Sequence, residues 1–323
     1  MTSRPAADAA IAVQGLTRTY GTGSDAFTAV AGVDLEVARG TIVALLGVNG
    51  AGKTSTMEVI EGLAPATSGE VRVLGLHPVA DRREVRRRSG VLLQRTGFVG
   101  DLTVAETLRM WATTLTAPRP WEESLEMLAL GGRRDVAARN LSGGELRRLD
   151  LACTLMGRPE VVMLDEPTTG LDPESRRAVW DLIAGLRDEG GAVLLTTHFL
   201  DEAEHLADRV SIMREGRIVR EGTVAEIVAG EPSTIGFGPP GRELPVSLQA
   251  QIRVVRGRTE IRTATLQPTL ATLLRWAEDH DLTLADLAVS SPSLEAVFLR
   301  IARERGADDV SAHADHLLEG ATR

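Results

Sequence analysis

The chain has 323 residues, of which 43% are hydrophobic and 25% are charged, as in an ordinary globular protein. This composition excludes wholesale disorder and collagen-like repeats, and a single cysteine, Cys153, excludes a disulfide scaffold. A net charge of −9 does not favour a basic nucleic-acid-binding surface, so no nucleic-acid partner is expected. The longest apolar stretch, residues 42–48, is far shorter than the ~20 residues of a membrane helix. Any membrane role is therefore expected to come through a partner.

Short β-type runs alternate with longer helical patterns from residue 11 to about residue 222, which predicts an α/β domain with a largely parallel sheet. We assign this domain to residues 1–230. Residues 77–140 show few strand signals, which indicates a helical insertion. Strands are expected at 33–37, 41–46, 71–74, 161–164 and 193–196, a hairpin at 211–219, and helices at 54–62, 145–156 and 174–187.

The remainder of the chain has its own pattern. The Pro- and Gly-rich residues 231–245 predict a linker. Residues 246–305 predict a small α+β accessory domain, with strands at 252–255 and 259–265 and helices at 270–280 and 293–303. Residues 306–323 are expected to form a loose tail.

The strongest motif lies between a predicted strand and a predicted helix. Residues 47–54 read Gly-Val-Asn-Gly-Ala-Gly-Lys-Thr and match the P-loop pattern completely. The glycines let backbone N–H groups turn toward phosphate oxygens, and the helix N-terminus adds partial positive charge. Lys53 is expected to reach the β- and γ-phosphates, and the Thr54 hydroxyl to coordinate Mg²⁺. The predicted nucleotide-binding residues here are Gly47, Asn49, Gly50, Ala51, Gly52, Lys53, Thr54 and Ser55.

A second motif places two acids at the end of a buried strand. Residues 161–164 are apolar, and Asp165 and Glu166 follow directly. In open α/β sheets ligands bind at the carboxyl ends of the strands. We expect Asp165 to hold Mg²⁺ and Glu166 to act as general base toward the attacking water. Taken without the P-loop, the pair is equally consistent with an ordinary exposed strand end.

The segment Leu141-Ser142-Gly143-Gly144-Glu145 narrows the class of NTPase. With it, residues 11–228 resemble the ATP-binding subunits of ABC transporters, and the motifs follow the family's order. The resemblance implies a RecA-like core, an antiparallel β subdomain and a helical subdomain, with ATP and Mg²⁺ as cofactors. Ser142, Gly143 and Gly144 can form a second phosphate-binding turn. The resemblance implies that this turn serves another copy's nucleotide in a head-to-tail homodimer. Glu145 departs from the family's more usual glutamine.

The same resemblance assigns roles to four residues that their own context leaves open. Tyr20 matches the aromatic that stacks on adenine, and Gln94 matches the Q-loop glutamine, a catalytic and Mg²⁺-contacting residue. Asp172 belongs to the D-loop and His198 matches the histidine that contacts the γ-phosphate. Without the resemblance, a lone tyrosine is more often a packing residue and a lone histidine more often structural.

Residues 291–298 resemble the C-terminal stretch of daunorubicin-resistance-type exporter ATPases, although an ordinary amphipathic helix would read similarly. This resemblance implies an ATP-hydrolysing subunit that powers export of a hydrophobic small molecule through a separate polytopic permease. Its place would be the cytoplasmic face of the cell membrane. The alternatives are an exporter of lipid, polysaccharide or metal-linked cargo, an importer subunit, and a soluble ABC-type ATPase acting on ribosomes or DNA.

Overall fold

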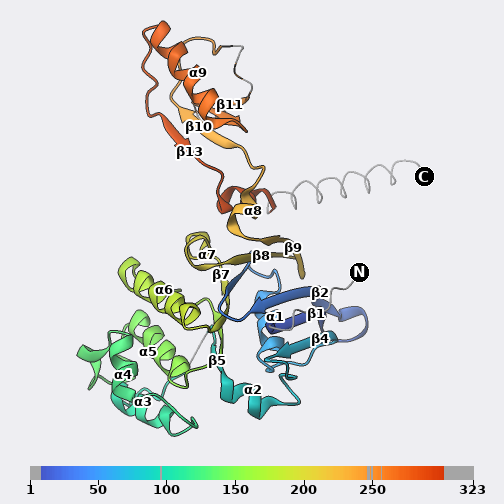
Figure 1. The fold of residues 1–323 in the computed structure, drawn as a ribbon, viewed down its shortest axis with the longest axis vertical. Helices are drawn as coiled ribbons and strands as arrows, with labels where there is room; N and C mark the ends of the chain where they lie inside the picture. The colour runs from blue at the N-terminus through green and yellow to red at the C-terminus, as the bar shows by residue number, and fades with distance from the viewer. Residues whose placement is uncertain (1–8, 95–96, 246–247, 249, 256, 302–323) are drawn as a thin grey trace. The chain divides into compact units, whose positions relative to one another are not determined.

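The computed structural model describes residues 9–94, 97–245, 248, 250–255 and 257–301. The chain divides into two compact units, Met1–Val224 and Ala225–Arg323 (Figure 1). In the described part of the chain no helix is both long and apolar enough to cross a membrane.

A six-stranded sheet forms the centre of the first unit. Five of its strands run parallel, and the last strand pairs antiparallel with its neighbour. In spatial order the strands are β5 (Ser89–Leu92), β6 (Val161–Asp165), β7 (Ala192–Thr197), β3 (Ile42–Leu46), β8 (Arg209–Arg214) and β9 (Arg217–Gly222). Every residue of β6, β7 and β3 is buried, which explains their nearly continuous apolar sequences.

A three-stranded antiparallel sheet packs against this centre. Its order is β2 (Phe27–Ala38), β1 (Ala9–Tyr20) and β4 (Ser68–Val73). One buried core joins Ile11 of this sheet, Leu45 of β3 and Met57 of α1 (Lys53–Ile60). Helix α1 contacts strands of both sheets and is thereby fixed at the end of β3.

The helices of the first unit include two groups whose members contact one another, α3 to α5 and α6 with α7. Helices α3 (Val104–Ala112), α4 (Trp121–Met127) and α5 (Gly143–Leu155) contact one another and lie together in Figure 1. The other elements are α2 (Arg82–Arg88), α6 (Pro173–Asp188), α7 (Leu200–Leu206) and the short 3₁₀ turns Gly23–Asp25, Gly131–Arg133 and Ala138–Asn140. Helices α6 and α7 pack on each other and on β7.

The segment 77–140, predicted as a helical insertion, differs from the structure at both ends. It contains β5, which pairs with β6 inside the central sheet. Because β5 has four residues and follows the Arg-rich α2 directly, its sequence carries little strand signal. Helix α5 packs with the helical group but begins beyond residue 140.

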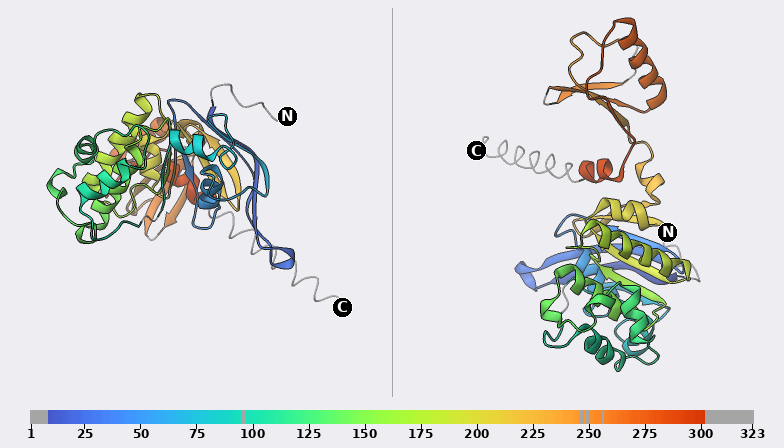
Figure 2. Two further views of the ribbon diagram at one scale, coloured as in Figure 1. Left: turned by 90° about the horizontal axis from the view of Figure 1, so that it is seen from below. Right: turned by 90° about the vertical axis from the view of Figure 1, so that its left-hand side faces the viewer.

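The second unit is an antiparallel sheet with one helix along a face (Figure 2). The sheet order is β11 (Gln251–Val255), β12 (Arg258–Thr263), β10 (Ser233–Phe237) and β13 (Ala288–Ser290). Helix α9 (Leu266–Asp279) packs on the sheet, and the core includes Phe237, Ile261 and Trp276. The unit also contains helical residues 294–301 and all of α8 (Val224–Val228) except its first residue.

Strand β10 lies within residues 231–245, where a linker is predicted. It is a central strand, paired with both β12 and β13, and its residues alternate between buried and half-buried. Pro232 before it and Gly238-Pro239-Pro240-Gly241 after it outweigh this five-residue alternation in the sequence. The predicted tail, 306–323, lies outside the described residues.

Candidate functional site

The loop between β3 and α1 is shaped by two glycines that leave no space for a side chain. A Cβ on Gly47 would lie 2.7 Å from the Met213 carbonyl oxygen. Gly52 has φ +105°, and a Cβ there would collide with the Ala29 carbonyl oxygen. Since α1 begins directly after Gly52, its first N–H groups have no intrahelical acceptor. The loop therefore offers backbone N–H groups as hydrogen-bond donors at the N-terminus of α1.

Lys53 is buried within this loop, with 7% of its surface exposed. Its Nζ donates to the Gly47 carbonyl oxygen at 2.7 Å and lies 3.4 Å from that of Val48. Burial lowers the pKa of the ammonium group, while the nearby carboxylates of Glu166 and Asp165 raise it. The amine is thus held in the loop where phosphate oxygens would be bound.

A pocket of about 350 Å³ opens over the loop. Residues from four separate parts of the first unit line it, and most of the predicted nucleotide site is among them. The lining residues are Phe27, Ala29, Asn49, Gly50, Ala51, Gly52, Lys53, Thr54, Ser55, Gln94 and Glu166.

The two acids lie at the carboxyl end of β6, where Asp165 pairs with Thr196 of β7. Asp165 is 4% exposed and accepts a hydrogen bond from the Thr196 hydroxyl. Glu166 has φ +50°, a strained conformation for a residue with a side chain. His198 Nδ1 lies 3.2 Å from Glu166 Oε1, and the Thr169 hydroxyl donates to Oε2 at 3.2 Å. Glu166 and His198, predicted from separate motifs, therefore share one site.

Tyr20 lies beside the loop but not among the residues that line the pocket. Its hydroxyl is 3.1 Å from Ser55 Oγ and donates to Glu58 Oε2 at 3.2 Å. Directly across the hairpin from Tyr20 is Phe27, which is 63% exposed and does line the pocket. The sequence did not single out Phe27, because the predicted strand began only at residue 33. A prediction that β1 and β2 form a hairpin would have placed the ring of Phe27 opposite that of Tyr20.

The turn Ser142-Gly143-Gly144 does not line this pocket. Ser142 caps α5: its hydroxyl accepts from the Glu145 N–H at 3.2 Å, and its own N–H donates to Glu145 Oε2 at 2.8 Å. The Ser142 N–H and Arg133 hold the pKa of Glu145 below its ordinary value. This reciprocal cap explains why a glutamate suits the position where the family usually has glutamine.

Asp172 also lies outside the pocket and has a local structural role. It caps α6 by accepting from the N–H groups of Glu174 at 3.1 Å and Ser175 at 3.0 Å. Hydrogen bonds from Ser175 lower the pKa of the Asp172 carboxyl.

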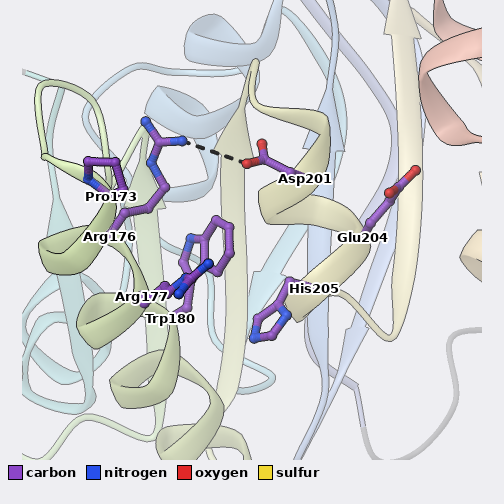
Figure 3. Close-up of a pocket in the computed structure, with 7 residues that line it drawn as sticks. All are labelled: Pro173, Arg176, Arg177, Trp180, Asp201, Glu204 and His205. Carbon is purple, nitrogen blue, oxygen red and sulfur yellow. Dashed lines mark ion pairs between the residues drawn. The ribbon is translucent and has the colours of Figure 1, made fainter. Parts of the chain in front are cut away.

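A second pocket, of about 410 Å³, lies between α6 and α7 (Figure 3). It contains none of the predicted site residues. Arg176 pairs with Asp201 at 3.6 Å, and Trp180 stacks on His205 with ring centroids 4.9 Å apart. The Trp180 indole N–H donates to Glu202, a fully buried carboxyl group that also accepts from Thr168. These contacts join the two helices to the segment after Glu166.

Comparisons with known proteins identify the family of this chain. Residues 30–169 match the family described as ABC transporter, and residues 233–293 match the ABC transporter domain-containing protein-like C-terminal domain. Doxorubicin resistance ATP-binding protein DrrA of Mycobacterium tuberculosis is 34% identical over 98% of this chain and 99% of its own length. Nod factor export ATP-binding protein I of Paraburkholderia xenovorans is 37% identical over 85% of this chain and 92% of its own length.

Solved structures show the same fold. An ATP binding subunit of an ABC transporter aligns with a TM-score of 0.61 and 27% identity, over 67% of this chain and 91% of its own. The cbiO1 protein of Clostridium perfringens aligns with a TM-score of 0.60 and 26% identity, over 69% and 92%. The predicted P-loop fold class and the family resemblance are confirmed. The chain belongs to the ABC transporter family, as an ATP-binding subunit with an ATPase domain.

Proposed function

We propose that this subunit hydrolyses MgATP to power outward transport of a hydrophobic small molecule through a separate polytopic permease. It would act as a homodimer at the cytoplasmic face of the membrane. The observation that carries the proposal is the full-length similarity to a doxorubicin resistance ATP-binding protein, which extends across both units of the chain.

Within each copy, the loop N–H groups and Lys53 bind the phosphates, and Tyr20 and Phe27 supply the aromatic surface for adenine. Glu166 takes the proton of the attacking water. His198, at 3.2 Å from that carboxylate, orients it and contacts the γ-phosphate. The strained backbone of Glu166 aims its side chain into the pocket.

The residues proposed to hold the metal fit Mg²⁺. Thr54, Gln94 and Asp165 offer a hydroxyl, an amide oxygen and a carboxylate, the hard oxygen ligands that Mg²⁺ prefers. Thr54 and Gln94 line the pocket, and the buried Asp165 lies directly before Glu166 at the end of β6. The metal would neutralise charge on the phosphate oxygens.

The proposed homodimer, which the family resemblance implies, is supported by the second phosphate-binding turn. Ser142, Gly143 and Gly144 form the N-terminus of the 13-residue α5, yet they do not line the pocket of their own chain. A turn of this kind suits an anion. We infer that it completes the nucleotide site of a second copy.

A second candidate for the cargo stands beside the hydrophobic small molecule. Relatives named Nod factor export ATP-binding protein I are 33–38% identical to this chain. Their name gives a cargo other than doxorubicin, so the alternative from the sequence, an exporter of lipid or polysaccharide, stands beside the first candidate. The two candidates share the ATPase chemistry and differ in the permease.

The test uses Glu166→Gln and Lys53→Ala. The glutamine variant should bind a fluorescent ATP analogue with unchanged affinity and hydrolyse ATP roughly 10²-fold or more slowly, because it lacks the base. It should also elute as a dimer when ATP is present. Lys53→Ala should lose nucleotide affinity. Near-normal turnover of Glu166→Gln would contradict the assignment of the base.

The transport role is tested by affinity capture with the ATP-loaded Glu166→Gln chain. The bait is mixed with detergent-solubilised membranes of its host, and the Lys53→Ala chain is the control. A stoichiometric polytopic membrane protein would support export and identify the permease. Ribosomal or DNA-bound proteins without such a partner would refute the transport role.

A further inference from the structure

Arg147 is a buried guanidinium that the motifs do not single out. It lies on α5, five residues after the cap Ser142, and is 9% exposed. All of its hydrogen bonds to backbone carbonyl oxygens reach segments outside α5. The acceptors are Leu93 at 2.6 Å from Nη1, Asp165 and Glu166 from Nη2 (2.8 Å to Glu166), and Pro167 at 3.2 Å from Nε.

These acceptors belong to two functional segments. Leu93 directly precedes Gln94, and Asp165 and Glu166 are the acids at the end of β6. Arg147 donates to their main-chain carbonyl oxygens and not to either carboxylate group. Its further charged contact is Asp150, one helical turn along α5, at 3.5 Å from Nη1.

The planar guanidinium is required for this set of contacts. Its donors point in different directions within one plane, so a single group can reach carbonyls on two separate segments. A lysine ammonium carries the same charge at a single point and cannot reach both. A buried arginine is tolerated when its donors are satisfied, and here each of its three nitrogens donates.

Arg147 is also rigidly connected to the turn at the start of its helix. The reciprocal cap between Ser142 and Glu145 orders the first turn of α5. Gly143 and Arg147 are separated by one helical turn, a rise of about 6 Å. Fixing Arg147 therefore fixes where the turn Ser142-Gly143-Gly144 lies relative to Glu166 and Gln94.

We propose that Arg147 is a positioning residue that holds the Ser142-Gly143-Gly144 turn in register with the acids of β6 and with Gln94. Through it, the site that binds one nucleotide determines how the same chain presents its turn to the nucleotide of the second copy. The link between two nucleotides rests on the proposed homodimer. The position of the turn relative to Glu166 and Gln94 within one chain does not depend on that homodimer.

The test compares Arg147→Lys and Arg147→Met with Arg88→Met. Arg88 is a suitable control because its guanidinium is also partly buried and binds Glu160 with two nitrogens, at 2.6 and 2.8 Å. That pair lies at the amino ends of β5 and β6, away from the pocket. ATP affinity, kcat and KM are measured for each variant, and thermal melting confirms folding.

Arg147→Lys should bind ATP within twofold of the unaltered chain, because the P-loop is intact, while kcat falls at least tenfold. Arg88→Met should retain kcat within twofold. In a Glu166→Gln background, Arg147→Lys should weaken ATP-driven dimer formation at least tenfold. Arg147→Met should lose kcat at least as severely as Arg147→Lys.

Two results would overturn the positioning role: a kcat of Arg147→Lys within twofold of normal, or a loss of kcat matched by an equal loss of ATP affinity. The second result would mean that Arg147 only supports the fold of the pocket. If the single variant Glu166→Gln does not dimerise with ATP, the proposed homodimer fails, and the register within one chain is judged by kcat and ATP affinity alone.

Discussion

The carboxyl group of Glu61 should make the stability of this protein depend on pH. Glu61 follows α1 as its C-cap and is 5% exposed. Its Oε1 has no hydrogen-bond partner among the described residues. Burial, with smaller contributions from the charges of Asp165 and Glu58, raises the pKa of Glu61 from 4.5 to about 8. The folded protein therefore keeps this group protonated at neutral pH.

The direction and size of the effect follow from proton linkage. Between pH 4.5 and about 8 the folded chain holds a proton that the unfolded chain has released, so the free energy of unfolding falls as pH rises. Each pKa unit corresponds to about 1.4 kcal/mol, so the full displacement amounts to roughly 5 kcal/mol lost by pH 8. Glu61→Gln keeps the size and neutrality of the protonated acid. It should thus be more stable than the unaltered chain at pH 8 by several kcal/mol, and about equal at pH 4.5.

The assay is urea denaturation of the nucleotide-free protein at half-unit steps from pH 5 to pH 8.5. Glu36→Gln, the same change at an exposed position of β2, controls for the loss of one charge. The stability difference between Glu61→Gln and the unaltered chain should widen steadily with pH. A constant difference across the range would show that Glu61 ionises at its ordinary pKa and would refute the reasoning.

Two further predictions concern groups that do not line the nucleotide pocket. Hydrogen bonds from Arg88 and then Arg39 lower the pKa of Glu160 to about 2, so its stabilising effect is complete above pH 4.5 and is lost as pH falls toward 2. Because Glu160 is 40% exposed, Glu160→Gln should cost no more than about 1 kcal/mol at pH 6 and nothing at pH 2 by urea titration. Burial raises the pKa of Cys153 to about 12, so iodoacetamide at pH 8 should modify it only after unfolding. Rapid labelling of the native protein, read by intact mass, would contradict its burial.

The centre of the fold and its phosphate loop were predictable from the sequence for a physical reason. Parallel strands covered on both faces must be apolar throughout, so β3, β6 and β7 appear as continuous apolar runs. The P-loop needs glycine where no side chain fits, as at Gly47 and Gly52. These constraints are local, so they are visible in one sequence.

The missed features depend on contacts between distant segments. Strands β5 and β10 are short, and only their pairing partners place them in the sheets, β5 at an edge beside β6 and β10 between β12 and β13. Arg147 and Glu61 resemble solvated polar residues until tertiary packing covers them. The sequence alone leaves the roles of Gln94 and His198 open, because a single glutamine or histidine carries no local pattern.

The chain contains a single lysine, Lys53, among 36 basic Lys and Arg residues. Its Nζ is therefore the only side-chain amine, and it is buried in the nucleotide pocket. Amine-directed reagents, which label most proteins at many surface sites, have one side-chain target here. Acylation of a side-chain amine therefore reports on Lys53 alone, whose burial and hydrogen bond to the Gly47 carbonyl oxygen slow the reaction in the folded chain. In contrast, the protein cannot be immobilised through surface lysines, because its one lysine is buried.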